Sequence, residues 1–132
     1  MILFPDPVAE LRAYLLGSGW FAGESIAMQP RPDDHVGLYV YLLDAGGPGI
    51  EDTVTMRARL TVECSHEDSA AASLASRRVD SLLRAWNTGR ALWQAELSRS
   101  RFDPDPDMRC PAYTSTHVVR FLGEEVTPPP AA

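Results

Sequence analysis

Lysine is absent from the sequence, so arginine alone supplies its positive charge. Twelve basic residues stand against eighteen acidic ones, which gives a net charge of −6 at pH 7. Nucleic acids and anionic membranes are bound through clustered positive charge that releases counterions. We therefore expect neither of them to be a specific ligand of this protein.

The sequence also has few cysteines and no long apolar run. Its two cysteines, Cys64 and Cys110, are too few and too far apart to predict a disulfide framework or a four-ligand zinc site. No apolar run approaches the roughly 20 residues that a membrane helix needs, and the first residues lack the basic flank of a signal peptide. These absences predict a soluble, intracellular protein, and a length of 132 residues predicts a single domain.

Motifs of catalysis are missing as well. The sequence contains no Gly-x-Ser-x-Gly elbow and no His-Glu-x-x-His pair, and its three histidines lie on separate segments. Cys64, His66 and Asp68 stand close together in a pattern that metal ligands or a Cys/His pair can adopt. An inward-facing strand cysteine beside helix-capping residues explains them better. We predict no catalytic residue, no cofactor and no metal, and therefore no enzyme.

Three aspartates, Asp103, Asp105 and Asp107, alternate like the start of a calcium-binding loop. That loop needs a glycine at its sixth position and a glutamate at its twelfth, where this chain has Met108 and Thr114. The match fails at both places. Because two prolines separate the aspartates, we favour a rigid acidic connection, which either stays solvated or serves as a contact element.

The clearest pattern in the chain is a strand followed directly by a helix. Residues 53–64 alternate strictly between apolar and polar side chains, which predicts a half-buried β-strand. Ser65 is a candidate N-cap, and an apolar stripe at helical spacing then runs to Trp86, before Asn87-Thr88-Gly89 ends the helix. The strand has one apolar face and the helix has one apolar stripe, and the two apolar surfaces should be buried against each other. This unit should therefore form the centre of the core.

The other segments complete an α+β fold with the order α-β-β-β-α-β-β. We predict an antiparallel or mixed sheet of four to five strands, with the long helix packed on one face and a short N-terminal helix after Asp6-Pro7. One domain spans residues 1–126, and residues 127–132 form a flexible Pro-rich tail. The predicted strands are residues 24–29, 35–45, 53–64, 91–102 and 112–124.

Two pairs of side chains are candidates for a protein interface. Tyr39 and Tyr41 lie on the second face of a strand that is rather apolar on both sides, and tyrosine is enriched at interfaces. A core position under the first helix explains them equally well. Arg57 and Arg59 lie on the polar face of the central strand, either as solvated residues or in a contact between subunits. The sequence leaves both choices open.

The order of elements resembles the tail terminator proteins of long-tailed bacteriophages. The similarity rests on the Pro-started first helix, the hairpin with its Gly46-Gly-Pro-Gly49 tip, and the strand that runs into the Ala/Leu/Arg-rich helix 67–86. It rests also on Arg101-Phe-Asp-Pro-Asp-Pro-Asp107, followed by Pro111-Ala-Tyr-Thr-Ser-Thr-His117-Val-Val. These motifs cover nearly the whole chain, and none of them is catalytic. Residues 23–32 match no motif of that family.

The resemblance implies a structural virion protein at the joint between tail and neck, made in the host cytoplasm. Such a protein forms a homo-hexameric ring that ends polymerisation of the tail tube protein and meets the head-completion or stopper protein. DNA passes through the lumen without specific binding. A head-completion protein is one alternative, and a small α+β ligand-binding domain or enzyme is another.

A ring requires heterologous contacts, in which one patch of a subunit meets a different patch of its neighbour. We expect one patch to hold Tyr39, Tyr41, Arg57 and Arg59, so that glutamate at both arginines should give folded monomers. The acidic segment with Asp103, Asp105 and Asp107 is the expected partner surface or contact along the ring axis.

Overall fold

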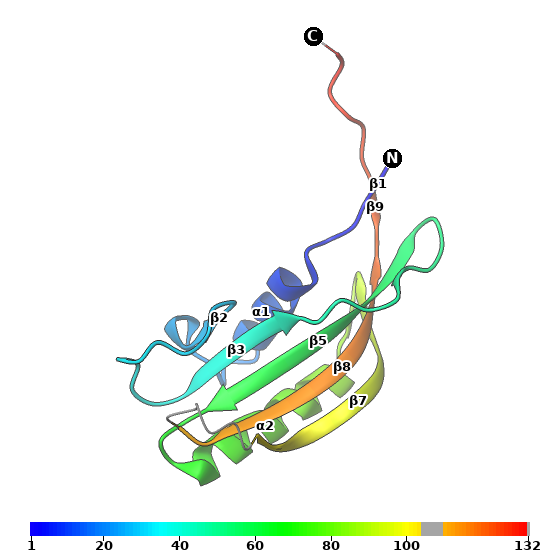
Figure 1. The fold of residues 1–132 in the computed structure, drawn as a ribbon. Coiled ribbons are helices and arrows are strands. Elements are labelled where there is room, and N and C mark those ends of the chain that lie inside the picture. Colours follow the sequence, from blue (N-terminus) through cyan, green and yellow to red (C-terminus); the bar gives the residue numbers. More distant parts are fainter. Residues whose placement is uncertain (104–109, 132) are drawn as a thin grey trace.

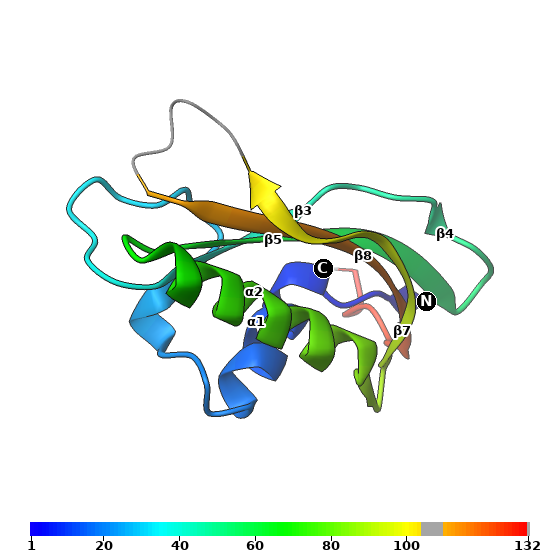
Figure 2. The same ribbon diagram turned by 90° about the horizontal axis from the view of Figure 1, so that it is seen from below.

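Two helices lie on the same face of a curled β-sheet in the computed structural model of this protein, which describes residues 1–103 and 110–131 (Figure 1). Figure 2 shows the sheet edge-on, with both helices beneath it and no helix above it. The fold is α+β, as predicted. The long helix crosses the sheet, and the short N-terminal helix lies beside it.

The elements follow the predicted order, with several short strands added. The two helices are α1 (Pro7–Gly17) and α2 (Ser69–Arg84), and a short 3-10 helix, η1 (Gly23–Ser25), follows α1. The strands are β1 (Ile2–Leu3), β2 (Ile26–Ala27), β3 (Tyr39–Asp44), β4 (Gly49–Ile50), β5 (Thr55–Ser65), β6 (Asn87–Thr88), β7 (Ala91–Asp103), β8 (Ala112–Leu122) and β9 (Glu124–Glu125).

The main sheet has seven strands, which is more than the four to five that we predicted. Its order is β2-β3-β5-β8-β7-β6, and β4 pairs with β5 off this path. β2 runs parallel to β3, and the other neighbours are antiparallel, so the sheet is mixed. The additional strands β4 and β6 are two residues long. Segments of that length carry no readable alternation, which is why the sequence did not reveal them.

Helix α2 begins at Ser69, and its N-cap is Asp68, three residues after the predicted N-cap Ser65. Ser65 is the last residue of β5 and is buried, whereas the Asp68 side chain accepts a hydrogen bond from the Ala70 amide and caps the helix. A free carboxylate next to exposed helix amides is favourable both as a hydrogen-bond acceptor and against the helix dipole. Strand β5 therefore continues one residue further than its apolar alternation suggested.

The core lies between the sheet and the two helices. Trp86, just after α2, stacks on Tyr14 of α1 with ring centroids 4.7 Å apart, and it meets Phe121 of β8 edge-on at 5.6 Å. The Tyr14 hydroxyl donates a hydrogen bond to the Leu82 carbonyl oxygen at 2.6 Å, which ties the two helices together. Burial of large aromatic side chains with satisfied polar atoms makes this contact a strong anchor.

One end of the molecule extends beyond the core. β1 and β9 pair there as a separate two-stranded ribbon, and the hairpin between β3 and β5 lies at the same end (Figure 1). The Val54 carbonyl oxygen accepts a hydrogen bond from the Gly123 amide at 2.7 Å, which links hairpin and ribbon. Residues 127–131 follow the ribbon and are exposed. In the described part of the chain, neither helix is long and apolar enough to cross a membrane.

Candidate functional site

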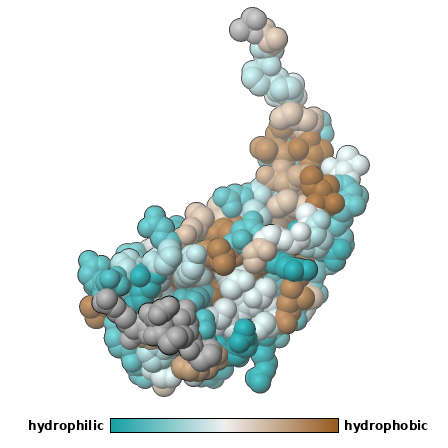
Figure 3. Space-filling model, in the orientation of Figure 1, coloured by the Kyte–Doolittle hydropathy of each residue, from teal (hydrophilic) through white to brown (hydrophobic). Residues whose placement is uncertain are grey.

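Among the described residues, no helix covers the sheet face opposite α1 and α2 (Figure 2), and this face carries the predicted interface residues of β5. Thr55, Arg57, Arg59, Thr61 and Glu63 of β5 project from this face, because the intervening residues are turned into the core. Figure 3 views this helix-free face and shows polar and apolar side chains mixed over it, with apolar ones gathered over the β1–β9 ribbon.

The four interface candidates differ in how far their side chains are available. Tyr39 is only 3% exposed, and its hydroxyl donates to the Gln29 carbonyl oxygen at 2.6 Å, so its ring is covered by its own chain. Tyr41 is half-buried on the helix-free face. The guanidinium of Arg57 forms an ion pair with Glu51 of the hairpin at 3.0 Å. Arg59 is exposed and has no ion-pair partner among the residues the structure describes.

Of the acidic candidates, only Asp103 is described. It ends β7, where its carboxylate accepts a hydrogen bond from the Thr114 hydroxyl at 3.4 Å. Asp105 and Asp107 lie outside the described residues. Strand β7 reaches Asp103, so the first aspartate of the predicted connection belongs to the sheet.

The cluster of Cys64, His66 and Asp68 serves the turn from β5 into α2. Cys64 is fully buried in the core, and this burial raises the pKa of its thiol far above the ordinary value. The His66 ring accepts a hydrogen bond from the Asp68 amide through Nδ1 at 2.9 Å, and Asp68 caps the helix. The side chains thus have local structural partners and do not converge on one point.

A different polar cluster, which the sequence reasoning missed, lies beneath the sheet. Asp80 of α2, Glu96 of β7 and His117 of β8 place ligand-type atoms within 4.8 Å of one another. His117 is fully buried, and its Nε2 lies 2.9 Å from Asp80 Oδ1. The signal in the sequence was Ser76 and Asp80, two polar residues four apart within the apolar stripe of the helix.

The contacts of His117 define its protonation pattern. The Trp93 indole N–H, which is a donor only, points at His117 Nδ1 over 3.0 Å, so Nδ1 is the acceptor. Nε2 then carries the ring proton and donates a hydrogen bond to Asp80 Oδ1. A metal ion bound at Nε2 would have to displace this proton and break the pair. The Glu96 carboxylate also accepts a hydrogen bond from the Arg84 guanidinium at 2.9 Å. The cluster is therefore better suited to joining α2, β7 and β8 than to holding a metal.

Asp80 is the centre of this cluster. Its second oxygen, Oδ2, accepts a hydrogen bond from the Ser100 amide at 2.8 Å and lies 3.7 Å from the Arg84 guanidinium. Burial alone would raise the pKa of the Asp80 carboxyl, but the hydrogen bonds from His117 and Ser100 outweigh it and leave the pKa below its ordinary value. The aspartate therefore stays charged at neutral pH.

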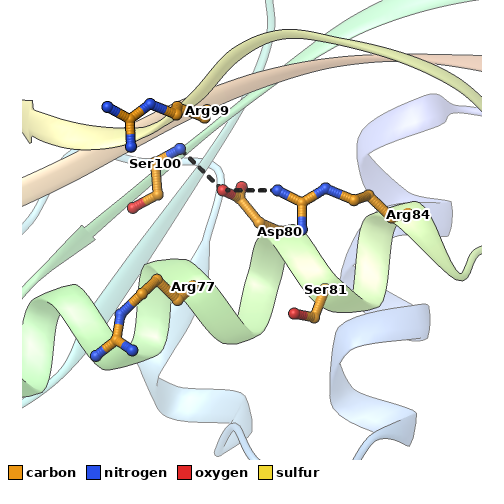
Figure 4. A pocket seen from close by; sticks show the side chains of 6 residues that line it. All are labelled: Arg77, Asp80, Ser81, Arg84, Arg99 and Ser100. Carbon is orange, nitrogen blue, oxygen red and sulfur yellow. Dashed lines mark hydrogen bonds and ion pairs between the residues drawn. The ribbon is translucent and has the colours of Figure 1, made fainter.

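A polar pocket opens to solvent beside the cluster, between α2 and β7 (Figure 4). It has a volume of about 420 Å³ and is lined by Arg77, Asp80, Ser81, Arg84, Arg99 and Ser100. Arg77 and Arg84 come from the helix and Arg99 from the strand, and Asp80 lies between the helix and the strand, bound to Ser100 and Arg84. The pocket is thus basic at its rim, on a protein whose net charge is negative.

No family model matches the chain, and the search of curated proteins found no match to it. The fold and the surfaces described above therefore carry the functional argument.

Proposed function

We propose that this chain is a structural phage protein that caps the tail tube, ends its polymerisation and forms the joint to the head-completion complex as a ring of identical subunits. The observation that carries the proposal is the open sheet face next to a protruding hairpin. The resemblance in the order of elements supports the same assignment.

The helix-free face supports a contact role because of its side chains. Tyr41 and Leu43 project from β3 on this face, and Leu43 is 42% exposed. Arg59 lies on the next strand with its charge unpaired within the described chain. Tyrosine and arginine are enriched in protein interfaces, because each combines a large contact area with hydrogen-bonding capacity. We assign Tyr41 and Arg59 to the contact and leave out Tyr39, which its own chain covers.

The hairpin is held in place for such a role. Glu51 forms ion pairs with Arg57 of β5 and Arg120 of β8, at 3.0 and 3.1 Å. The carboxylate of Asp52 accepts hydrogen bonds from the Val54 and Thr55 amides, and these bonds lower the pKa of Asp52. A hairpin that is ordered before binding loses less conformational entropy when a partner docks.

The negative net charge fits a ring through which DNA passes. A lumen lined by positive charge would retain the phosphate backbone by counterion release, whereas an acidic protein repels it. The proposal therefore needs no DNA-binding surface.

The test is to polymerise the cognate tail-tube protein with and without this chain and to measure tube lengths by negative-stain electron microscopy. We expect tubes that stop growing and carry one extra ring at the end. Arg59→Glu should lose most of this effect, whereas Arg90→Glu, which reverses a charge near the ribbon, should keep it. Tubes of unchanged length with no bound protein would contradict the proposal, and binding to the neck alone would favour a head-completion protein.

A further inference from the structure

The two edges of the main sheet carry opposite charge. At one edge, β7 and the adjoining helix α2 contribute the arginines around the pocket, Arg77, Arg84 and Arg99. Arg84 is held by Asp80 and Glu96. Arg77 and Arg99 are exposed and have no ion-pair partner in residues 1–103 and 110–131. This edge thus presents two available guanidinium groups, one from each wall of the pocket.

The opposite edge is acidic. Glu24 of η1 precedes the edge strand β2, Asp33 and Asp34 lie in the loop between β2 and β3, and Asp44 ends β3. Arg31 of this loop and Arg12 of helix α1 are both bonded within their own chain. Arg12 donates hydrogen bonds to backbone carbonyl oxygens of residues 23 and 26, and Arg31 forms an ion pair with Glu67 at 2.8 Å. Glu24 and Asp34 are exposed.

We propose that the pocket between α2 and β7 receives the acidic β2–β3 edge of a second copy of this chain, so that carboxylates such as those of Glu24 and Asp34 pair with Arg77 and Arg99. A single chain that carries opposite charges on opposite edges is complementary to itself head to tail. Contacts of this kind are heterologous, and they close into a ring when the rotation between subunits allows it. The inference rests on the proposed function and names the second patch of the ring contact.

The structure of β7 favours contact through side chains over strand pairing. β6 pairs only with Ala91 and Leu92, so the rest of β7 is an open edge. Register shifts interrupt this strand between Trp93 and Ala95 and twice more before Arg101. Bulges and charged side chains on an edge strand prevent a neighbour from adding a strand there. The pocket therefore remains the feature that a neighbour can enter.

The acidic edge and the candidate interface are continuous. Tyr41 lies in β3, whose neighbour at the edge is β2, and it pairs in register with Ala27. A neighbour docked on the β2–β3 edge would therefore reach the part of the helix-free face that holds Tyr41. Aromatic contact at the centre and ion pairs around it is a common arrangement at interfaces.

The test begins with self-association of the full chain, measured by sedimentation velocity over a range of concentrations at about 20 mM and about 500 mM salt. Exposed charge pairs are screened over about 10 Å at 0.1 M salt and over shorter distances at higher salt. We expect association at low salt, weakened at high salt. Arg77→Glu/Arg99→Glu should weaken it roughly tenfold or more, as should Glu24→Arg/Asp34→Arg. Arg90→Glu, a reversal outside the pocket, should associate like the natural chain.

Mixing the two double variants gives the decisive readout. Each variant alone has two edges of the same sign, but an acidic pocket on one faces a basic edge on the other. We expect the mixture to regain association, with both variants in one complex. Thermal melting of each variant should stay near that of the natural chain, since all four positions are exposed.

A monomeric natural chain at low salt, or double variants that associate normally, would overturn the edge-to-edge contact. A mixture that stays monomeric would do the same. None of these results decides whether the protein caps tubes, because the tube-length experiment measures that separately. Conversely, salt-sensitive association restored by mixing, together with unchanged tubes, would support this contact and contradict the proposed function.

Discussion

The two faces of the central strand β5 differ in burial. Leu60, Val62 and Cys64 face the helices and are almost completely buried. Arg59, Thr61 and Glu63 face the other way, where no helix lies. One face of the strand packs on the chain's own helices, and in our proposal the other face contacts another protein. Substitutions on the two faces should therefore affect different properties.

The largest loss of stability is expected on the covered face. Leu60→Ala removes a fully buried side chain and should lower the free energy of unfolding by about 3 kcal/mol, through lost burial and the cavity left behind. Arg59→Ala, one residue away, is the matched control and should change it by less than about 0.5 kcal/mol. Urea unfolding followed by tryptophan fluorescence measures both. Equal losses at the two positions would show that the faces do not differ as described.

The buried polar cluster should come next in size. Asp80→Asn removes the charge that His117, Ser100 and Arg84 share, and it should cost about 2 kcal/mol at pH 7.

The same variant also has a pH signature. Because the folded-state pKa of Asp80 lies below its ordinary value of 3.8, its charge contributes stability above that pH, and the contribution is lost as the pH falls through the lowered pKa. The difference between the natural chain and Asp80→Asn should therefore shrink below about pH 4. Urea unfolding at pH 7, 5 and 3 checks this. A difference in unfolding free energy that does not change with pH would show that the Asp80 charge does not stabilise the fold.

A smaller effect is expected at the hairpin on the open face. Gly47 has a φ of +129°, and a Cβ atom there would lie 3.0 Å from the Arg59 amide nitrogen. Gly47→Ala should cost about 1–2 kcal/mol, because it strains the backbone and disturbs the bond from the Arg59 amide to the Gly46 carbonyl oxygen. Gly17→Ala, where the space is open, should be neutral or slightly stabilising. Thermal melting of the two variants provides the comparison, and equal melting temperatures would contradict it.

Sequence patterns predicted the large elements because burial imposes a period on them. The alternation in residues 53–64 and the helical stripe before Trp86 correspond to β5 and α2. They did not predict that Val36 would be 85% exposed, because β3 begins only at Tyr39. The loop before it is fixed by Arg31, which bonds Ser65, His35 and Glu67 from different segments.

Among the candidate site residues, those defined by a local pattern could be predicted, whereas those brought together by the fold could not. The outward orientation of Arg59 was predicted because a polar residue on a one-faced strand must point away from the core. The Asp80–His117 cluster and the arginine pocket were missed, because their residues are distant in the sequence and meet only in the folded chain. Asp80 is 37 residues from His117 and 20 residues from Ser100. A polar residue inside an apolar stripe is the local sign of such a cluster.

Whether the helix-free face takes part in assembly is decided by the mass in solution of the natural chain and of Arg59→Glu, determined side by side by light scattering at low salt. We expect a ring of several copies for the natural chain and a folded monomer for the variant, with nearly equal unfolding free energies. Equal masses for both proteins would contradict this expectation, because the open face would then have no part in assembly.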